Sequence, residues 1–109
     1  MERRLSKRVN VKLGAELVSG DRTYAGVIEN LSEHGIFMRT VPWETPVNCL
    51  PGTTIVLKFQ PSSGETLSLH CEVKWLHIDK TPSLGLTNSM GMAIIDPPRQ
   101  YKEFLRPLV

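Results

Sequence analysis

Two short groups of residues in this 109-residue chain have types and spacings suited to binding. Arg4 and Arg8 form an RxxxR spacing close to the N-terminus. The planar guanidinium fork donates paired hydrogen bonds to anionic groups such as phosphate, which a lysine ammonium reproduces less well. Asn30, Ser32 and Gly35 form an NxSxxG spacing between two apolar stretches. Asparagine offers both a donor and an acceptor, and glycine permits a close approach of the backbone to a ligand.

Each group alone has an ordinary structural explanation. RxxxR recurs in basic tails as a solvated charge run, and NxSxxG is typical of a turn in which Asn30 and Ser32 bond local backbone and Gly35 takes a positive φ. The distribution of charge favours a binding role over these structural explanations. Residues 1–12 carry a net charge of +4 in a chain whose total is only +2. A basic segment on a near-neutral body indicates one local anion site, not an extended nucleic-acid surface.

Catalysis and metal binding find little support in the sequence. The three histidines are at positions 34, 70 and 77, and the chain contains neither a nucleophile elbow nor a glycine-rich phosphate loop. Cys49 and Cys71 are far apart and outside any CxxC motif, so we expect reduced thiols and no metal. We therefore expect no enzyme. No apolar run is long enough to cross a membrane, and residues 1–10 are too polar for a secretory signal, which indicates the cytoplasm.

The elements that must position these residues are strands. Apolar side chains alternate with polar ones, and turn residues separate the stretches, which predicts an all-β fold: a six-stranded antiparallel barrel closed to remove its edges. The predicted strands cover about 9–17, 23–30, 35–40, 53–60, 67–75 and 90–95, with a bulge in the second, a proline-rich loop at 41–52 and a polar connection at 79–89. In the fifth strand the odd positions point inward, which places Trp75 in the core, whereas Trp43 is the better candidate for a partner contact. Asp96 as an N-cap predicts a short helix from about residue 97.

In this order and β context, the two motifs resemble those of the PilZ domain, the bacterial receptor for cyclic di-GMP. Val73-Lys74-Trp75 and the strand from Met90 to Ile94 also resemble the VxW and GxGhxF blocks of that family. The chain departs from the last block, because Ser89 or Met90 replaces the first glycine and an isoleucine replaces the aromatic residue. The family fold, a six-stranded split barrel with a C-terminal helix, agrees with the alternation of the strands. The resemblance divides the chain into a flexible basic tail, residues 1–8, and a barrel domain, residues 9–109.

The resemblance implies a cytoplasmic sensor that binds cyclic di-GMP as ligand, with no cofactor. Arg4 and Arg8 would close over the ligand, since the arginine fork also fits the O6 and N7 acceptors of guanine. Asn30 and Ser32 would take a guanine edge, and Gly35 would leave space for the ligand. The auxiliary basic residues Arg3 and Lys7 would steer the anion. The tail would order on binding and pass the signal to a downstream protein partner.

Two other functions remain as alternatives. A ligand-independent PilZ-fold adaptor would have lost the two motifs, and both are present here. A single-stranded nucleic-acid barrel would need exposed stacking aromatics, and most of the seven aromatic residues fall on positions predicted to point inward. An amphipathic C-terminal helix is compatible with a homodimer. The sequence leaves open whether one cyclic di-GMP or an intercalated pair binds, and which process is controlled.

Overall fold

The computed structural model describes residues 8–40, 49–61, 64–83 and 85–108. Arg3, Arg4, Lys7 and Trp43 lie outside these ranges. The described residues form six strands and two short helices at the C-terminal end. In chain order they are β1 (Val9–Ser19), β2 (Arg22–Leu31), β3 (Gly35–Thr40), β4 (Thr54–Phe59), β5 (Leu67–Thr81), β6 (Gly85–Ile94), the helix α1 (Arg99–Leu105) and the 3-10 turn η1 (Arg106–Leu108).

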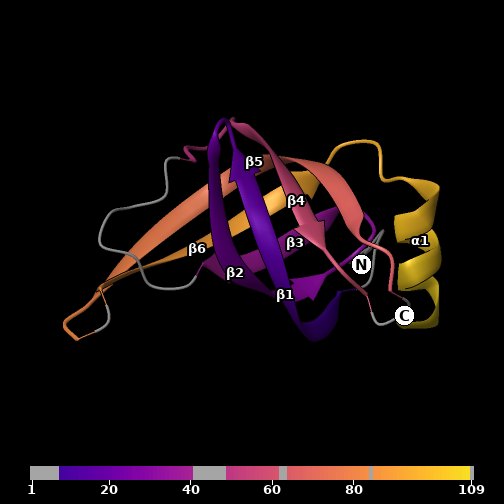
Figure 1. The fold of residues 1–109 in the computed structure, drawn as a ribbon, viewed down its shortest axis with the longest axis horizontal. Coiled ribbons are helices and arrows are strands. Elements are labelled where there is room, and N and C mark those ends of the chain that lie inside the picture. The colour runs from indigo at the N-terminus through magenta and orange to yellow at the C-terminus, as the bar shows by residue number, and fades with distance from the viewer. Residues whose placement is uncertain (1–7, 41–48, 62–63, 84, 109) are drawn as a thin grey trace, which may run out of the picture.

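The strands form a closed antiparallel barrel in the order β1-β2-β3-β6-β5-β4. Closure pairs every strand on both sides, which removes the free edges that otherwise promote aggregation. In Figure 1 the helix α1 stands beside one end of the barrel, and the paired strands β5 and β6 extend well past the other strands at the opposite end. The predicted fold class, a six-stranded antiparallel barrel with a short C-terminal helix, is confirmed.

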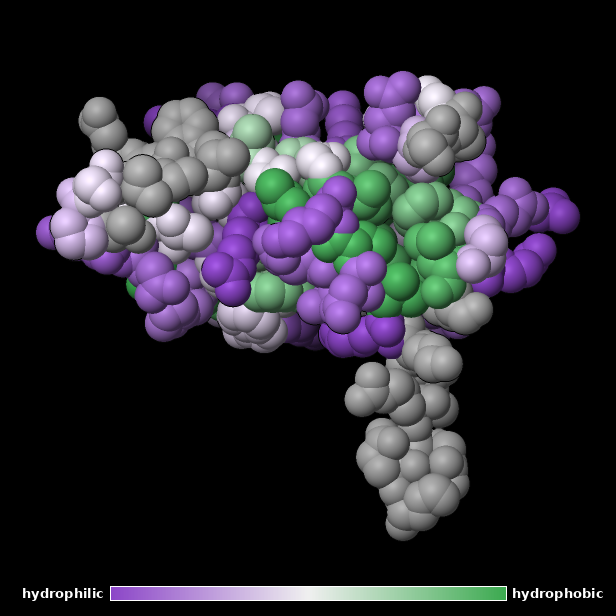
Figure 2. Space-filling model, turned by 90° about the horizontal axis from the view of Figure 1, so that it is seen from below, coloured by the Kyte–Doolittle hydropathy of each residue, from purple (hydrophilic) through white to green (hydrophobic). Residues whose placement is uncertain are grey.

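The core follows from the alternation of the strands. Leu67, Leu69, Cys71 and Val73 point inward from the first part of β5, as their odd positions predict, and all are buried. Some large apolar side chains stay on the outside, and Figure 2 shows hydrophobic residues gathered in the middle of one face with hydrophilic ones around them. The large apolar side chains with the most exposed surface are Leu50, Trp75, Ile78, Ile95 and Leu108.

The prediction that Trp75 belongs to the core is wrong, and a β-bulge is the reason. The register of β5 against β6 shifts between the pairs Val73–Met92 and Trp75–Gly91, so Lys74 is an extra residue on β5. A bulge places two successive residues on the same side and reverses the alternation beyond it. Trp75 therefore lies on the outer surface, with 45% of its surface exposed.

A second bulge occurs in β2, the strand in which the sequence predicted one. The pairing of β2 with β3 shifts between Ile28–Met38 and Asn30–Phe37, which makes Glu29 the extra residue. Ile28 on one side of the bulge and Leu31 on the other are both fully buried. Asn30 is consequently left on the outer face at the end of β2.

Two predicted boundaries are wrong. Residues 79–89 were expected to form a polar connection, but β5 and β6 pair through this segment as far as Thr81 and Gly85. Backbone pairing in a hairpin needs no buried face, so a polar sequence can continue the ladder. The helix begins at Arg99, after Pro98 in the N-cap position, with no side-chain cap. Asp96 instead has a positive φ of 47° and does not cap the helix.

Candidate functional site

The site begins with a contact between the two sequence motifs. Arg8 comes directly before β1, and its Nη1 donates a hydrogen bond of 2.7 Å to Oδ1 of Asn30. The two residues come together because Asn10, near the start of β1, pairs with Asn30 at the end of β2. The sheet register therefore brings the second arginine of RxxxR to the first residue of NxSxxG.

The rest of NxSxxG is a tight turn between β2 and β3. The backbone N–H of Ser32 donates to the carbonyl of Gly35 at 2.9 Å, and the N–H of Gly35 donates to Oγ of Ser32 at 3.1 Å. Ser32 is buried, and its hydroxyl also lies 3.4 Å from the Gly35 carbonyl. In this structure the serine hydroxyl is thus part of the turn that carries the site.

Gly35 leaves space for the guanidinium of Arg8. A Cβ atom added to Gly35 would lie 3.0 Å from Nη2 of Arg8, closer than nearly all such contacts in proteins. The φ of Gly35 is not positive, so the expectation of a left-handed turn residue is wrong here. The sequence predicted that a ligand would approach the backbone of Gly35 closely. In this structure the guanidinium of Arg8 makes that close approach.

Trp75 forms the opposite wall of the site, although the alternation of the sequence predicted it in the core. Its ring stacks on Phe37 with centroids 5.6 Å apart and planes inclined by 27°. A Cβ on Gly91 would fall within 2.1 Å of the indole Nε1, so the glycine allows the ring to lie flat on β6. The VxW block and Gly91 were visible in the sequence, but the bulge that turns Trp75 outward was not.

These residues surround two adjoining hollows on the outer face. One, of about 300 Å³, reaches from Arg8 across Gly35 to the indole of Trp75. The other, of about 350 Å³, extends from the same arginine over Asn30 and Phe37. The full sets of lining residues are Arg8, Ser32, His34, Gly35, Lys74, Trp75, Gly91, Met92 and Ala93 for the first, and Arg8, Asn30, Ile36, Phe37, Trp75 and Gly91 for the second. Arg8, Trp75 and Gly91 belong to both.

The charges around the hollows leave Arg8 available for an anion. Lys12 pairs with Glu29 at 3.0 Å and Lys74 with Glu72 at 3.4 Å. Within the part of the chain that the structure describes, no carboxylate lies at ion-pair distance from Arg8. A guanidinium beside an exposed aromatic ring can hold a planar group that also carries negative charge.

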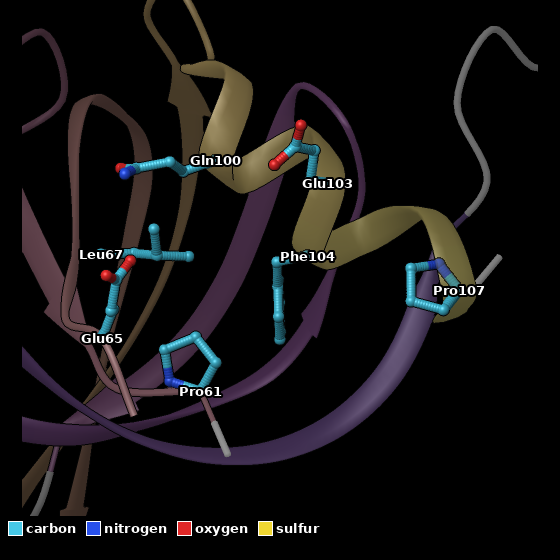
Figure 3. Close-up of a pocket in the computed structure, with 7 residues that line it drawn as sticks. All are labelled: Pro61, Glu65, Leu67, Gln100, Glu103, Phe104 and Pro107. Carbon is cyan, nitrogen blue, oxygen red and sulfur yellow. The ribbon is translucent and has the colours of Figure 1, made fainter. Parts of the chain in front are cut away.

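A further hollow, of about 350 Å³, lies beside the C-terminal helix (Figure 3). Leu67 and Phe104 form apolar walls, and the carboxylates of Glu65 and Glu103 are among the other lining groups. Glu103 is paired with Arg99 at 3.4 Å, whereas Glu65 adds unpaired negative charge among the described residues. This hollow is unsuited to a phosphate group, because the carboxylate would repel it.

Two other classes of site find no support in the described residues. Across residues 8–40, 49–61, 64–83 and 85–108, histidine, cysteine and carboxylate side chains form no group of three that could hold a metal ion. The helices in those same ranges include none with the length and apolar character needed to span a membrane.

The closed antiparallel barrel thus carries an arginine, an amide and an exposed indole close together on its outer face. The model of the PilZ domain family matches residues 2–109, and the chain belongs to that family. No curated protein matches the chain in sequence.

Solved structures share the fold at low sequence identity. The PilZ domain with c-di-GMP of YcgR from Escherichia coli is 11% identical with a TM-score of 0.73, and the match covers 96% of this chain and 87% of that one. The K. pneumonia MrkH-c-di-GMP complex is 14% identical with a TM-score of 0.72. The Bacillus subtilis Inhibitor of motility (MotI/DgrA) is 15% identical with a TM-score of 0.71. The last two matches cover 99% of this chain but only 53% and 50% of those chains, so this chain spans about half their length.

Proposed function

We propose that this chain is a cyclic di-GMP receptor of the bacterial cytoplasm that passes ligand binding on to a protein partner. The observation that carries the proposal is the convergence of Arg8, Asn30 and the exposed indole of Trp75 on two adjoining hollows. Membership of the PilZ family and the c-di-GMP named in two of the solved structures support it.

The chemistry of the ligand fits these groups. Cyclic di-GMP has two guanine bases and two phosphodiesters, so it offers flat π faces, O6 and N7 acceptors and two negative charges. Trp75 supplies a stacking face for one base, and Arg8 supplies a planar fork for a phosphate or a guanine edge. The hollows, of about 300 and 350 Å³, are at the lower end of the size range of ligand pockets.

Binding requires Arg8 to exchange a contact. In the structure its Nη1 donates to Asn30, and a guanine edge that approaches Asn30 competes for the same oxygen. Releasing this bond frees both side chains for the ligand. Arg4, from the tail, adds a second fork, while Arg3 and Lys7 steer the anion toward the site. Ordering of residues 1–8 over the ligand creates the surface that a partner recognises.

The test is isothermal titration of cyclic di-GMP into the purified protein. We expect saturable binding in the micromolar range, no binding of GTP, and at least a tenfold loss of affinity in Arg8→Ala, since one good bidentate contact contributes about 1 to 3 kcal/mol. Arg8→Lys keeps the charge but not the fork and is expected to recover only part of the affinity. Arg22→Ala removes an exposed arginine that lines neither hollow and serves as the matched control.

The remaining outcomes favour the other functions. A folded wild-type protein that gives no heat up to about 100 μM ligand would overturn the receptor function and leave a PilZ-fold adaptor that acts by protein contact. Binding of many single-stranded sequences, weakening steeply with salt, would instead favour a nucleic-acid barrel.

A further inference from the structure

A buried tyrosine from the C-terminal helix is hydrogen-bonded to the turn that carries the candidate site. Tyr101 of α1 has no exposed surface, and its hydroxyl donates to the backbone carbonyl of Ser32 at 2.5 Å. The two residues are 69 positions apart in the chain. This bond joins α1 directly to the turn between β2 and β3, within the NxSxxG motif.

Two hydrogen bonds attach the turn to other parts of the barrel, in addition to the pairing of the strands that flank it. The bonds between Ser32 and Gly35 hold its shape, and the residues at its ends, Leu31 and Gly35, pair with Val9 of β1 and Ala93 of β6. Within the turn, the N–H of Ile94 donates to the carbonyl of His34 at 2.9 Å, and the hydroxyl of Tyr101 donates to the carbonyl of Ser32. Both donors belong to the last part of the chain. A buried carbonyl without a donor is costly, so the Ser32 carbonyl depends on Tyr101.

We propose that Tyr101 is a positioning residue for the nucleotide site and that its bond to Ser32 couples the packing of α1 to occupancy of that site. The inference rests on the proposed function. The bond holds Ser32, two residues after Asn30 and three before Gly35, so a shift of the turn changes the space in which Arg8 and the ligand meet.

The surroundings of Tyr101 keep its hydroxyl a donor. Burial raises the pKa of Tyr101 well above its ordinary value, the nearby Cys71 and Glu33 add to the rise, and the charge of Arg8 opposes it. The phenol is therefore protonated throughout the neutral range.

The rest of α1 is held by packing that does not involve the turn. Phe104 contacts Phe59 of β4 edge to face, with centroids 5.5 Å apart, and Leu105 is buried in the core. The helix can thus be weakened at Leu105 without removing the bond at Ser32. If this bond couples α1 to the ligand site, ligand binding favours the bonded position of Tyr101, and loss of the bond lowers ligand affinity by the same factor.

The experiment compares Tyr101→Phe with Leu105→Ala by titration of cyclic di-GMP and by thermal unfolding. Tyr101→Phe removes one hydroxyl and keeps the ring, and we expect it to lower affinity by about five- to tenfold, the effect of one lost hydrogen bond. Leu105→Ala leaves a cavity, so we expect it to lower the unfolding temperature at least as much as Tyr101→Phe does. Because it keeps the bond to Ser32, we expect it to change ligand affinity less than twofold. Unchanged affinity in Tyr101→Phe, or losses of affinity in both variants that follow their losses of stability, would overturn the positioning role.

A second measurement needs no variant. In the wild-type protein, saturating cyclic di-GMP is expected to slow amide hydrogen exchange in α1, through the bond to Ser32, beyond its effect in β4. Unchanged exchange in α1 with ligand bound would overturn the coupling. If the wild-type protein does not bind cyclic di-GMP, the proposed function fails and this inference fails with it. If the wild-type protein binds cyclic di-GMP, but hydrogen exchange in α1 and the affinity of Tyr101→Phe are both unchanged, only this inference fails and the proposed function stands.

Discussion

At Gly35 a hydrogen atom occupies the place where a methyl group would lie 3.0 Å from Nη2 of Arg8. At Gly91 the same absence of a side chain allows the indole of Trp75 to lie on the strand. Both glycines are needed for the space they leave, since neither has a positive φ. The site therefore depends on two positions with no side-chain chemistry of their own.

We predict that Gly35→Ala lowers cyclic di-GMP affinity by about tenfold with little change in unfolding temperature. The added methyl displaces the end of an exposed, flexible arginine, which costs the fold little but moves the fork away from Asn30. Gly14→Ala is the control, because a Cβ there meets no atom within 4 Å. Titration and thermal unfolding of both variants test this, and wild-type affinity in Gly35→Ala would contradict it.

We predict that Trp75→Ala lowers affinity by about 1 to 3 kcal/mol, the usual contribution of stacking between a base and an aromatic side chain. The fold is expected to survive, because Trp75 is 45% exposed. Trp75→Phe should retain part of the affinity. In a Trp43→Phe background the fluorescence of Trp75 should change as ligand saturates the protein, and a constant signal during measurable binding would rule out stacking on this ring.

At the scale of elements, bulges decide which strand residues reach the site. The extra residues Glu29 in β2 and Lys74 in β5 each reverse the alternation, so that Asn30 and Trp75 lie outside, whereas Ile28 and Val73 before the bulges are buried. Before its bulge β5 keeps strict alternation and presents Cys71 to the core with no exposed surface. One strand thus supplies both part of the core and one wall of the candidate site.

Burial of the two thiols, Cys71 in β5 and Cys49 in the segment before β4, leads to a prediction about reactivity. Burial raises the pKa of Cys71 to about 12 and also raises that of Cys49, where a hydrogen bond with Ser19 opposes part of the rise. Both thiols are therefore protonated as well as enclosed at pH 8. We expect iodoacetamide to leave both unmodified in the folded protein and to modify both in guanidinium chloride, as read by mass spectrometry. Rapid labelling of either thiol under native conditions would contradict the packing described here.

For the whole molecule, closure of the barrel buries groups that can ionise only after unfolding. Cys71 titrates near pH 9.0 when exposed and near 12 when folded, and the pKa of Tyr101 is likewise raised above its ordinary value of 10.0. Above pH 9 the unfolded chain loses protons that the folded chain keeps, so the free energy of unfolding falls as pH rises. Below about pH 8 both groups are protonated in both states and contribute almost no pH dependence.

We predict that the midpoint of urea unfolding falls between pH 9 and pH 10.5. Each group that titrates only in the unfolded chain contributes a decrease of about 1.4 kcal/mol per pH unit. Cys71→Ala is expected to flatten the dependence, even though the variant is less stable at pH 7.5. If the urea midpoint of this variant falls as steeply with pH as that of the wild type, groups other than Cys71 cause the pH dependence.

The sequence by itself determined the class of fold, and it predicted which two motifs form the candidate site. Alternation at every second residue fixes strands with one buried face, and six of them without long helices between neighbours favour a closed antiparallel barrel. The types and spacing of Arg8, Asn30 and Gly35 predicted a binding role for them, because the guanidinium fork, the amide and the missing side chain have properties that do not depend on the fold.

Only the tertiary structure decided how those residues meet and what else joins them. Alternation cannot locate a bulge, since one extra residue leaves the apolar pattern nearly unchanged but reverses the side on which Trp75 lies. The partner of Arg8 and the bond from Tyr101 to Ser32 depend on strand register and on helix docking, which join residues 22 and 69 positions apart. Such contacts are set by the packing of the whole chain, and no local pattern specifies them.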